Sequence, residues 1–218
     1  MVYYLGIDLG TTGLKAVLSD KNGKIYGIGY REYPLHIPKV GYAEQDPKDW
    51  YRAMCKAIQD VLHQTGIAAG AIRCIGFSGQ MHGLVALGKD KNTLRPAIIH
   101  CDGRASKQKR EVMEKIGVET LGAWVQNQLH SGFQALSLVW MRECEPELYQ
   151  RIRHVLTPKD YLRFCLTGEV ASEVTDASGT LMYDSSASAG AGSCSKRLKS
   201  IPQFSRTQIT ALAIRPAG

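Results

Sequence analysis

The sequence predicts an α/β domain whose mixed sheet begins with antiparallel hairpins, and three observations support this fold class. Tyr3–Leu9 is a run of apolar, aromatic and β-branched residues, which is typical of a buried strand. Two further strand-like runs, Leu14–Ser19 and Lys24–Glu32, follow a glycine turn and an Asn-Gly turn. From residue 46 onward, helical segments alternate with short apolar runs, as expected of a sheet flanked by helices.

The first helical segment has recognisable ends. Asp46 followed by Pro47 indicates an N-cap with proline at the first helical position, and Gly66 closes the element. Short strands are expected over residues 72–77 and 84–87. Further helices are expected over residues 106–116, 132–144, 147–154 and 159–164, the last ending near Gly168.

The charge is distributed unevenly along the chain. Of the formal net charge of +7, residues 185–218 carry five basic side chains and no acidic one, so the body of the chain is close to neutral. A phosphate-tracking surface needs a basic face on the folded body, so no nucleic-acid partner is expected. The sequence therefore predicts one domain over residues 1–184 and an unpatterned basic tail over residues 185–218.

Location and cysteine use give weaker indications. No apolar run is long enough to span a membrane, and the first residues, Met1–Asp8, lack the basic start of a signal peptide, so a cytoplasmic location without a membrane partner is expected. The six cysteines are scattered without zinc-ligand spacing, which favours reduced, mostly buried thiols.

The turn after the first strand is the most informative stretch. Asp8 ends the strand, and Gly10, Thr11 and Thr12 follow in a tight turn that can direct backbone N–H groups and hydroxyls at a phosphate. A carboxylate beside a phosphate requires a bridging cation, so the motif predicts a nucleotide with Mg²⁺. Lys15, in the next strand, is the last candidate for this nucleotide site. The spacing of the glycines fits neither a P-loop nor a Rossmann fingerprint. The alternative is a plain glycine hairpin without a ligand.

A second polar loop follows the strand that ends near residue 77. Gln80, Met81 and His82 lie between glycines, and the amide and imidazole groups are suited to binding sugar hydroxyls. Taken alone, this segment is better explained as a surface loop with a satisfied histidine than as a sugar-binding loop.

Together these segments carry a family resemblance. The Asp-Leu-Gly-Thr-Thr turn resembles the phosphate-binding hairpin of the actin-like ATPase superfamily, whose domains have the ribonuclease H-like fold. Segments in six places resemble, in order, those of the carbohydrate kinases of the xylulokinase branch: residues 44–47 with Trp50, 78–83, 94–98, 102–104, 156–162 and 172–180. The resemblance covers residues 3 to about 184.

The resemblance implies an activity and a set of roles. It implies transfer of the γ-phosphate of ATP, with Mg²⁺, to the 5-hydroxyl of D-xylulose or a related sugar, and a homodimer in intact members. Asp8 would position the metal and phosphate, whereas Met81 and His82, beside Gln80, would contact the ketose. Asp102 and Arg104 would shape the sugar pocket, or else form a salt bridge within their loop. The alternative function for the chain is that of a sugar-binding domain without catalysis.

Several positions depart from the family pattern. His100 stands where the family often has Trp, and Ser137 replaces a Lys, so both bear on sugar specificity. The resemblance places the catalytic Asp and the adenosine-binding domain beyond Tyr183, and neither follows here, so we expect negligible kinase activity and marginal stability from this chain.

Back-translation of residues 190–196 in another frame yields a family-like helix, Trp-Ser-Arg-Glu-Leu-Leu-Lys, which suggests a frameshift near residues 186–189.

Overall fold

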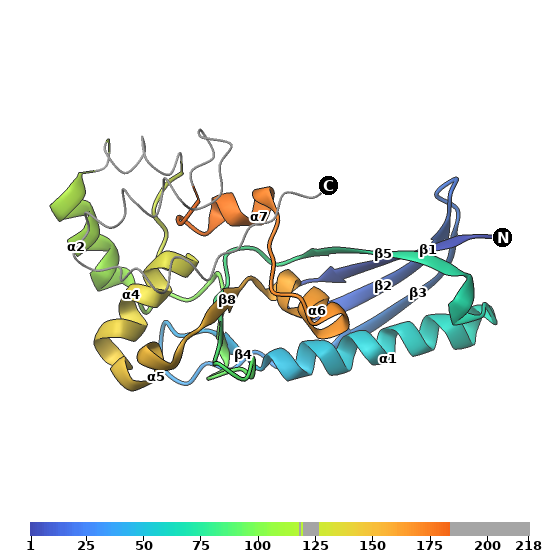
Figure 1. Ribbon diagram of the computed structural model, residues 1–218, viewed down its shortest axis with the longest axis horizontal. Coiled ribbons are helices and arrows are strands. Elements are labelled where there is room, and N and C mark those ends of the chain that lie inside the picture. The colour runs from blue at the N-terminus through green and yellow to red at the C-terminus, as the bar shows by residue number, and fades with distance from the viewer. Residues whose placement is uncertain (118, 120–126, 184–218) are drawn as a thin grey trace. The chain divides into compact units, whose positions relative to one another are not determined.

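A computed structural model describes residues 1–117, 119 and 127–183 of the chain (Figure 1). The expected tail at residues 185–218, and the frameshift suggested at its start, lie outside the described residues. The chain forms two compact units. Unit 1 comprises Met1–Leu35 and Asp46–Gln80, and unit 2 comprises His36–Gln45 and the described residues from Met81 to Tyr183.

Unit 1 is built on a four-stranded sheet in the order β3-β2-β1-β5. Its strands are β1 (Tyr3–Leu9), β2 (Gly13–Asp20), β3 (Ile25–Glu32) and β5 (Ile72–Gly79). The first three pair antiparallel through two successive hairpins, whereas β5 pairs parallel to β1. The sheet is therefore mixed and begins with antiparallel hairpins, which confirms the fold class predicted from the sequence.

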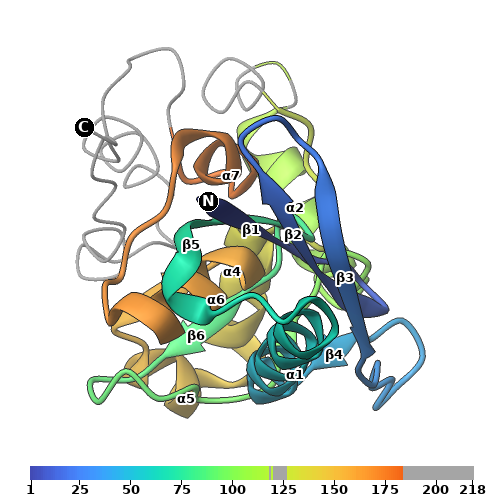
Figure 2. The same ribbon diagram turned by 90° about the vertical axis from the view of Figure 1, so that its right-hand side faces the viewer.

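Helix α1 (Pro47–Thr65) covers one face of this sheet and runs along β2 and β3 (Figures 1 and 2). The Asp46 carboxylate accepts a hydrogen bond from the N–H of Lys48, and Gly66 closes the helix with a left-handed backbone. Both predicted helix ends are thus confirmed. Along β1, side chains toward the helix are buried while Tyr4 and Asp8 on the opposite face are exposed, following the two-residue period of a strand.

Two glycines allow α1 to approach β3 closely. A Cβ atom added at Gly27 would lie 2.8 Å from Cγ2 of Thr65. At Gly29 it would overlap the backbone carbonyl oxygen of Ala57, which cannot rotate away. The missing side chains on β3 therefore set the distance between helix and sheet.

Unit 2 combines short strands with helices, and its core is a cluster of apolar residues that includes Leu84, Ile98, Leu136 and Met182. Strand β4 (Glu44–Gln45) pairs antiparallel with β7 (Ala97–Ile98), and β6 (Val85–Leu87) pairs antiparallel with β8 (His154–Leu156). The helices are α2 (Ser106–Ile116), α4 (Gln134–Cys144), α5 (Pro146–Arg151), α6 (Pro158–Thr167) and α7 (Val174–Gly179).

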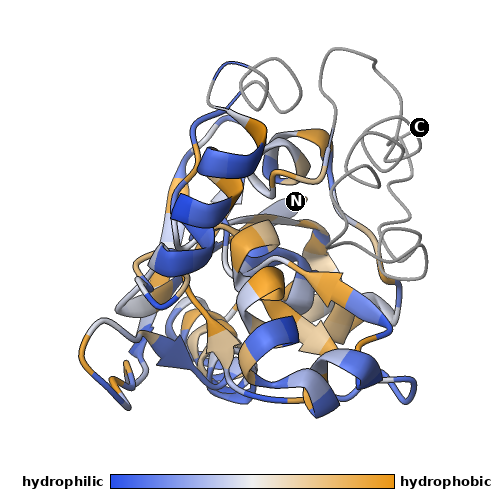
Figure 3. Cartoon of the chain, turned by 90° about the vertical axis from the view of Figure 1, so that its left-hand side faces the viewer, coloured by the Kyte–Doolittle hydropathy of each residue, from blue (hydrophilic) through white to orange (hydrophobic). Residues whose placement is uncertain are grey.

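Helix α2 has the pattern of a surface helix. It is largely hydrophilic, with apolar residues restricted to one side (Figure 3). Val112 on that side belongs to the apolar core, and Met113 and Ile116 pack against it partly buried. In the described part of the chain, no helix is both long and apolar enough to cross a membrane.

Some sequence expectations need correction. A helix was expected through His154, but α5 ends at Arg151 because Ile152 is extended and the next residues pair with β6 as strand β8. Helix α7 and strands β4 and β7 were not predicted. The five cysteines in the described residues are free thiols, as expected, but Cys74, Cys101 and Cys144 are exposed and not buried.

We predict that Gly29→Ala destabilises the protein by about 3 kcal/mol, because its methyl group would overlap a backbone carbonyl in a packed helix–sheet contact. The free energy of unfolding in urea measures the effect. Gly76→Ala, in β5, is the control: nothing lies within 4 Å of its added Cβ, so we expect a change within about 0.5 kcal/mol. Equal effects of the two substitutions would contradict the account of this contact.

Candidate functional site

The turn between β1 and β2 is closed by a hydrogen bond from the N–H of Gly10 to the carbonyl of Gly13, at 3.0 Å. The Tyr33 hydroxyl donates to the Gly10 carbonyl and holds the turn from outside. The ring of Tyr30 lies over Gly13, where an added Cβ would be 2.5 Å from its hydroxyl oxygen. Glycine at position 13 therefore leaves room for the Tyr30 ring over the turn.

Asp8 and Lys15 lie opposite each other on neighbouring strands, and both side chains are exposed. Ser78 of β5 lies beside Asp8 on the other side, so the three side chains share one face at the end of the sheet. Thr12 in the turn is exposed and Thr11 half-buried. Burial, followed by the charges of Tyr30 and Asp8, raises the pKa of Tyr33 well above its ordinary value, which keeps its hydroxyl protonated as a donor.

This end of the sheet fits the group that the sequence predicts there. Mg²⁺ is usually held by one or two carboxylates together with water and phosphate oxygens. Asp8 offers one exposed carboxylate, and Lys15 provides a cation for phosphate oxygens on the same face. All five candidates for the nucleotide site thus lie in one turn and its two flanking strands: Asp8, Gly10, Thr11, Thr12 and Lys15.

Gln80 is the last residue of unit 1. Its side chain is buried, and its N–H donates to the carbonyl of Leu9 at 2.7 Å, which extends the pairing of β5 with β1 by one residue. Unit 1 therefore ends beside Leu9, the residue that follows Asp8. Met81 and His82 then open unit 2.

Met81 and His82 form a tight bend. The Met81 side chain is 55% exposed, and the Gly83 N–H donates to the Met81 carbonyl at 2.8 Å. His82 has a left-handed backbone with φ of 63°, a region that residues other than glycine rarely adopt. Such strained residues persist only where the surrounding structure holds them, and they cluster at functional sites.

Gly83 and Gln134 anchor the end of this bend. The Gln134 side-chain amide donates to the carbonyls of Gly83 at 3.2 Å and Leu156 at 3.0 Å, which joins the bend to β8. A Cβ atom at Gly83 would lie 2.8 Å from Cγ of Pro158. The sequence prediction noted Gly83 but not Gln134, whose role depends on a long-range contact.

His82 is half-buried among other imidazoles. Burial is the largest influence on the pKa of His82 and lowers it below the ordinary value. The backbone of Gly179 and the charge of Asp176 act to raise this pKa, whereas the charges of His100 and His130 lower it further. Burial alone likewise lowers the pKa of His100. Nδ1 of His100 is buried without a hydrogen-bond partner among the described residues, so it is available to a bound polar group.

Asp102 and Arg104 form a buried ion pair. The guanidinium donates to both carboxylate oxygens, from Nε at 2.9 Å and from Nη2 at 2.8 Å. The carboxylate also accepts the N–H groups of Arg104, at 2.8 Å, and Ala43, at 2.5 Å. Of the two roles that the sequence allowed, these contacts favour the loop salt bridge, since both side chains are no more than 1% exposed.

The ion pair extends into a larger network. Arg104 also contacts the Glu44 carboxylate at 2.7 Å, and its guanidinium lies 4.0 Å from the ring centroid of Tyr42 and 4.8 Å from that of Trp140. Arg95 bridges Glu44 and Glu145. Asp102 and Glu44 outweigh burial and raise the pKa of Arg104. The network joins residues 42–44 to residues 102–104 and to α4.

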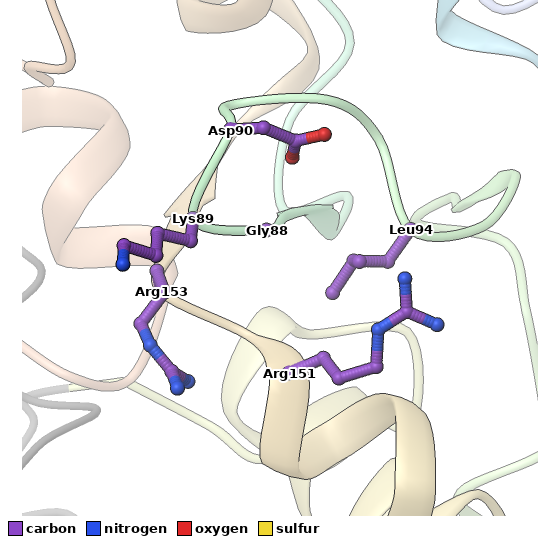
Figure 4. Close-up of a pocket in the computed structure, with 6 residues that line it drawn as sticks. All are labelled: Gly88, Lys89, Asp90, Leu94, Arg151 and Arg153. Atoms are coloured by element: carbon purple, nitrogen blue, oxygen red, sulfur yellow. The ribbon is translucent and has the colours of Figure 1, made fainter.

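A cavity elsewhere in unit 2 lacks the features of a substrate site (Figure 4). It is lined by charged surface residues, including Lys89, Arg151 and Arg153. Figure 4 shows that these side chains point in different directions, and Arg153 already donates to the carbonyls of Gln150 and Ile152. Their charged groups do not converge on one point, so this cavity presents no ready-made anion site.

Comparison with known proteins identifies the class of protein that this fold and these loops define. Residues 3–189 match the family model described as "FGGY family of carbohydrate kinases, N-terminal domain". The chain therefore belongs to the FGGY family of carbohydrate kinases, as the resemblance indicated. Carbohydrate kinases of this family use ATP.

Individual relatives are xylulose kinases. The chain is 40% identical over 182 residues to the xylulose kinase of Bacillus subtilis and 35% identical over 181 residues to that of Escherichia coli. The crystal structure of a ligand-bound xylulose kinase from Lactobacillus acidophilus superposes with a TM-score of 0.87 at 28% identity, covering 100% of this chain and 42% of that one. The sequence alignments with the Bacillus subtilis and Escherichia coli relatives cover 84% and 83% of this chain, but only 36% and 37% of the relatives' own length.

We predict that Arg104→Met destabilises the protein by about 3–5 kcal/mol, because it leaves the carboxylate of Asp102 buried without its cation and removes one of the two arginines that pair with Glu44. Urea unfolding measures the change. Arg110→Met, at an exposed position of α2, is the matched control with an expected change within about 0.5 kcal/mol. A small effect at Arg104 would show that the network contributes little to stability.

The lowered pKa of His100 predicts a pH dependence. Between its lowered folded value and the ordinary 6.5, the unfolded chain binds more protons than the folded one, so stability is lost as the pH falls through this window. His100→Gln should therefore reduce the slope of unfolding free energy against pH below about 6.5. Urea unfolding at several pH values measures this slope, and His63→Gln, at an exposed position of α1, is the control for the substitution.

Proposed function

We propose that this chain is the sugar-binding portion of a xylulose kinase-like enzyme. In this proposal the Met81–His82 bend binds the sugar acceptor and the Asp8 turn binds the metal–phosphate end of ATP. The observation that supports it best is the strained His82 beside an exposed Met81, at the loop that the sequence resemblance assigns to the substrate.

The proposed reaction is transfer of the γ-phosphoryl group of ATP to the 5-hydroxyl of a ketopentose, with D-xylulose as the first candidate. Such transfer depends mainly on positioning and charge neutralisation. Mg²⁺ would supply charge neutralisation at the phosphates when bound. Asp8 would orient the metal, Lys15 and the Gly10–Gly13 turn would contact phosphate oxygens, and His82 would orient the acceptor.

The residues divide into direct and indirect roles. Met81 and His82 reach solvent and can touch a sugar directly, while the side chain of Gln80 is buried and its N–H donates to the Leu9 carbonyl within unit 1. Asp102 and Arg104 act indirectly, since their polar groups are occupied by each other and by Glu44. Nδ1 of His100 is a further polar atom for an acceptor hydroxyl.

The chain spans a little over a third of the length of its curated relatives. The function of a complete enzyme is therefore distinguished from the function of this chain by itself. Phosphoryl transfer is proposed for the complete enzyme. For this chain by itself, we propose sugar binding with negligible turnover, which is also what a non-catalytic sugar-binding domain would do. ADP formation from ATP and D-xylulose by the chain would contradict this separation.

We predict that the chain binds D-xylulose in the absence of ATP and that His82→Ala weakens binding about tenfold, the effect of losing one good hydrogen bond. Isothermal titration calorimetry measures both affinities. His63→Ala, an exposed histidine on α1, is the matched control and should bind as the unmodified chain does. An unchanged affinity in His82→Ala would remove His82 from the proposed site.

A further inference from the structure

The His82 ring is enclosed from two sides by residues far apart in the sequence. On one side it stacks on Phe133, with ring centroids 3.9 Å apart and planes inclined by 35°. On the other side lies Gly179, where an added Cβ atom would be 2.5 Å from both Cε1 and Nδ1 of the imidazole. The ring therefore occupies a slot that only glycine at position 179 leaves open.

Gly179 is the last residue of α7, and local preference does not explain it. Its φ lies outside the left-handed region, so alanine could adopt the same backbone conformation. Alanine is also the better helix former. The requirement for glycine at this position therefore comes from the imidazole and not from the helix.

Helix α7 is itself held in place at its first turn. Glu173 caps it by accepting the N–H groups of Thr175 at 2.7 Å and Asp176 at 2.8 Å. The Asp176 carboxylate accepts the Thr157 hydroxyl at 2.8 Å and contacts Lys159 Nζ at 3.2 Å. These contacts tie α7 to Thr157, between β8 and α6, and to the first turn of α6.

Lys159 is the centre of this attachment. Its ammonium group lies within 3.3 Å of three carboxylates, those of Asp160, Glu173 and Asp176. Burial disfavours its charge, but Asp160 and Asp176 outweigh burial and raise its pKa. The ammonium thus stays charged and holds α7, and with it Gly179, at a fixed place against His82.

We propose that α7 is the positioning element for the substrate-binding imidazole, with Gly179 as the residue that sets the orientation of the His82 ring. This inference rests on the proposed sugar site and adds to it a residue outside the bend. A side chain at position 179 would displace the ring from Phe133 and change the direction of Nε2, the nitrogen that is left for a sugar hydroxyl because Nδ1 is buried beside Gly179. Gly179 is a positioning residue and touches no substrate in this account.

The test is Gly179→Ala in the 218-residue chain, with two readouts. The Cε1–H resonance of His82, assigned by its loss in His82→Gln, reports the pKa of the ring by NMR titration. Burial is the main cause of its lowered pKa, so a displaced ring should titrate closer to 6.5. The affinity for D-xylulose, measured by calorimetry, should fall about tenfold.

Gly70→Ala is the matched control, since nothing lies within 4 Å of its added Cβ, and it should change neither readout. Phe133→Leu removes the opposite wall and should move both readouts in the same direction, so it replaces Gly179→Ala if that variant does not fold. A folded Gly179→Ala chain with an unchanged titration, or with an unchanged affinity, overturns the proposal.

The two readouts also separate this inference from the proposed function. If the unmodified chain binds no D-xylulose, the proposed sugar binding by this chain has failed. The NMR titration then still decides whether Gly179 holds the His82 ring, because it needs no ligand.

Discussion

The buried contact between Arg104, Asp102 and Glu44 is the constraint on which the arrangement of unit 2 depends. The Arg104 guanidinium lies against the rings of Tyr42 and Trp140, and little of the three charged side chains reaches solvent. Their hydrogen bonds fix residues 41–45 beside residues 99–104, and β4 therefore pairs with β7. Ile98 of β7 in turn exchanges hydrogen bonds with Leu84, directly after the His82 bend. A buried ion network is a costly way to fix loops, but it specifies one arrangement because each group has only one set of partners.

Steric constraints act where charge does not. Gly29 sets the approach of α1 to the sheet, Gly13 accepts the Tyr30 ring, and Gly179 leaves space for His82. In each case the missing side chain allows a backbone or ring to come closer than any other residue would permit. The candidate phosphate turn and the candidate sugar bend therefore both depend on close packing next to exposed polar groups.

Elements with local signals could be predicted from the sequence. The Asp46–Pro47 start and the Gly66 end of α1 are coded by residues next to them, and the hairpins of the sheet are coded by their turns. Strands β4, β7 and β8 could not be predicted, since they are two or three residues long and exist only through pairing with distant segments. The candidate residues Asp8 and His82 were found because their motifs resemble a family. The environment of His82 was not, because Phe133 and Gly179 meet it only in the folded chain.

The central claim is that this chain carries the acceptor-binding bend of a sugar kinase. The most direct measurement is a titration of the ¹⁵N-labelled chain with D-xylulose, without nucleotide, followed by two-dimensional NMR. The account predicts saturable shifts centred on residues 80–83 and extending to His100, Phe133 and Gly179, with little change in the helix α1. Shifts that do not saturate, or that centre on another part of the chain while residues 80–83 stay unchanged, would contradict it.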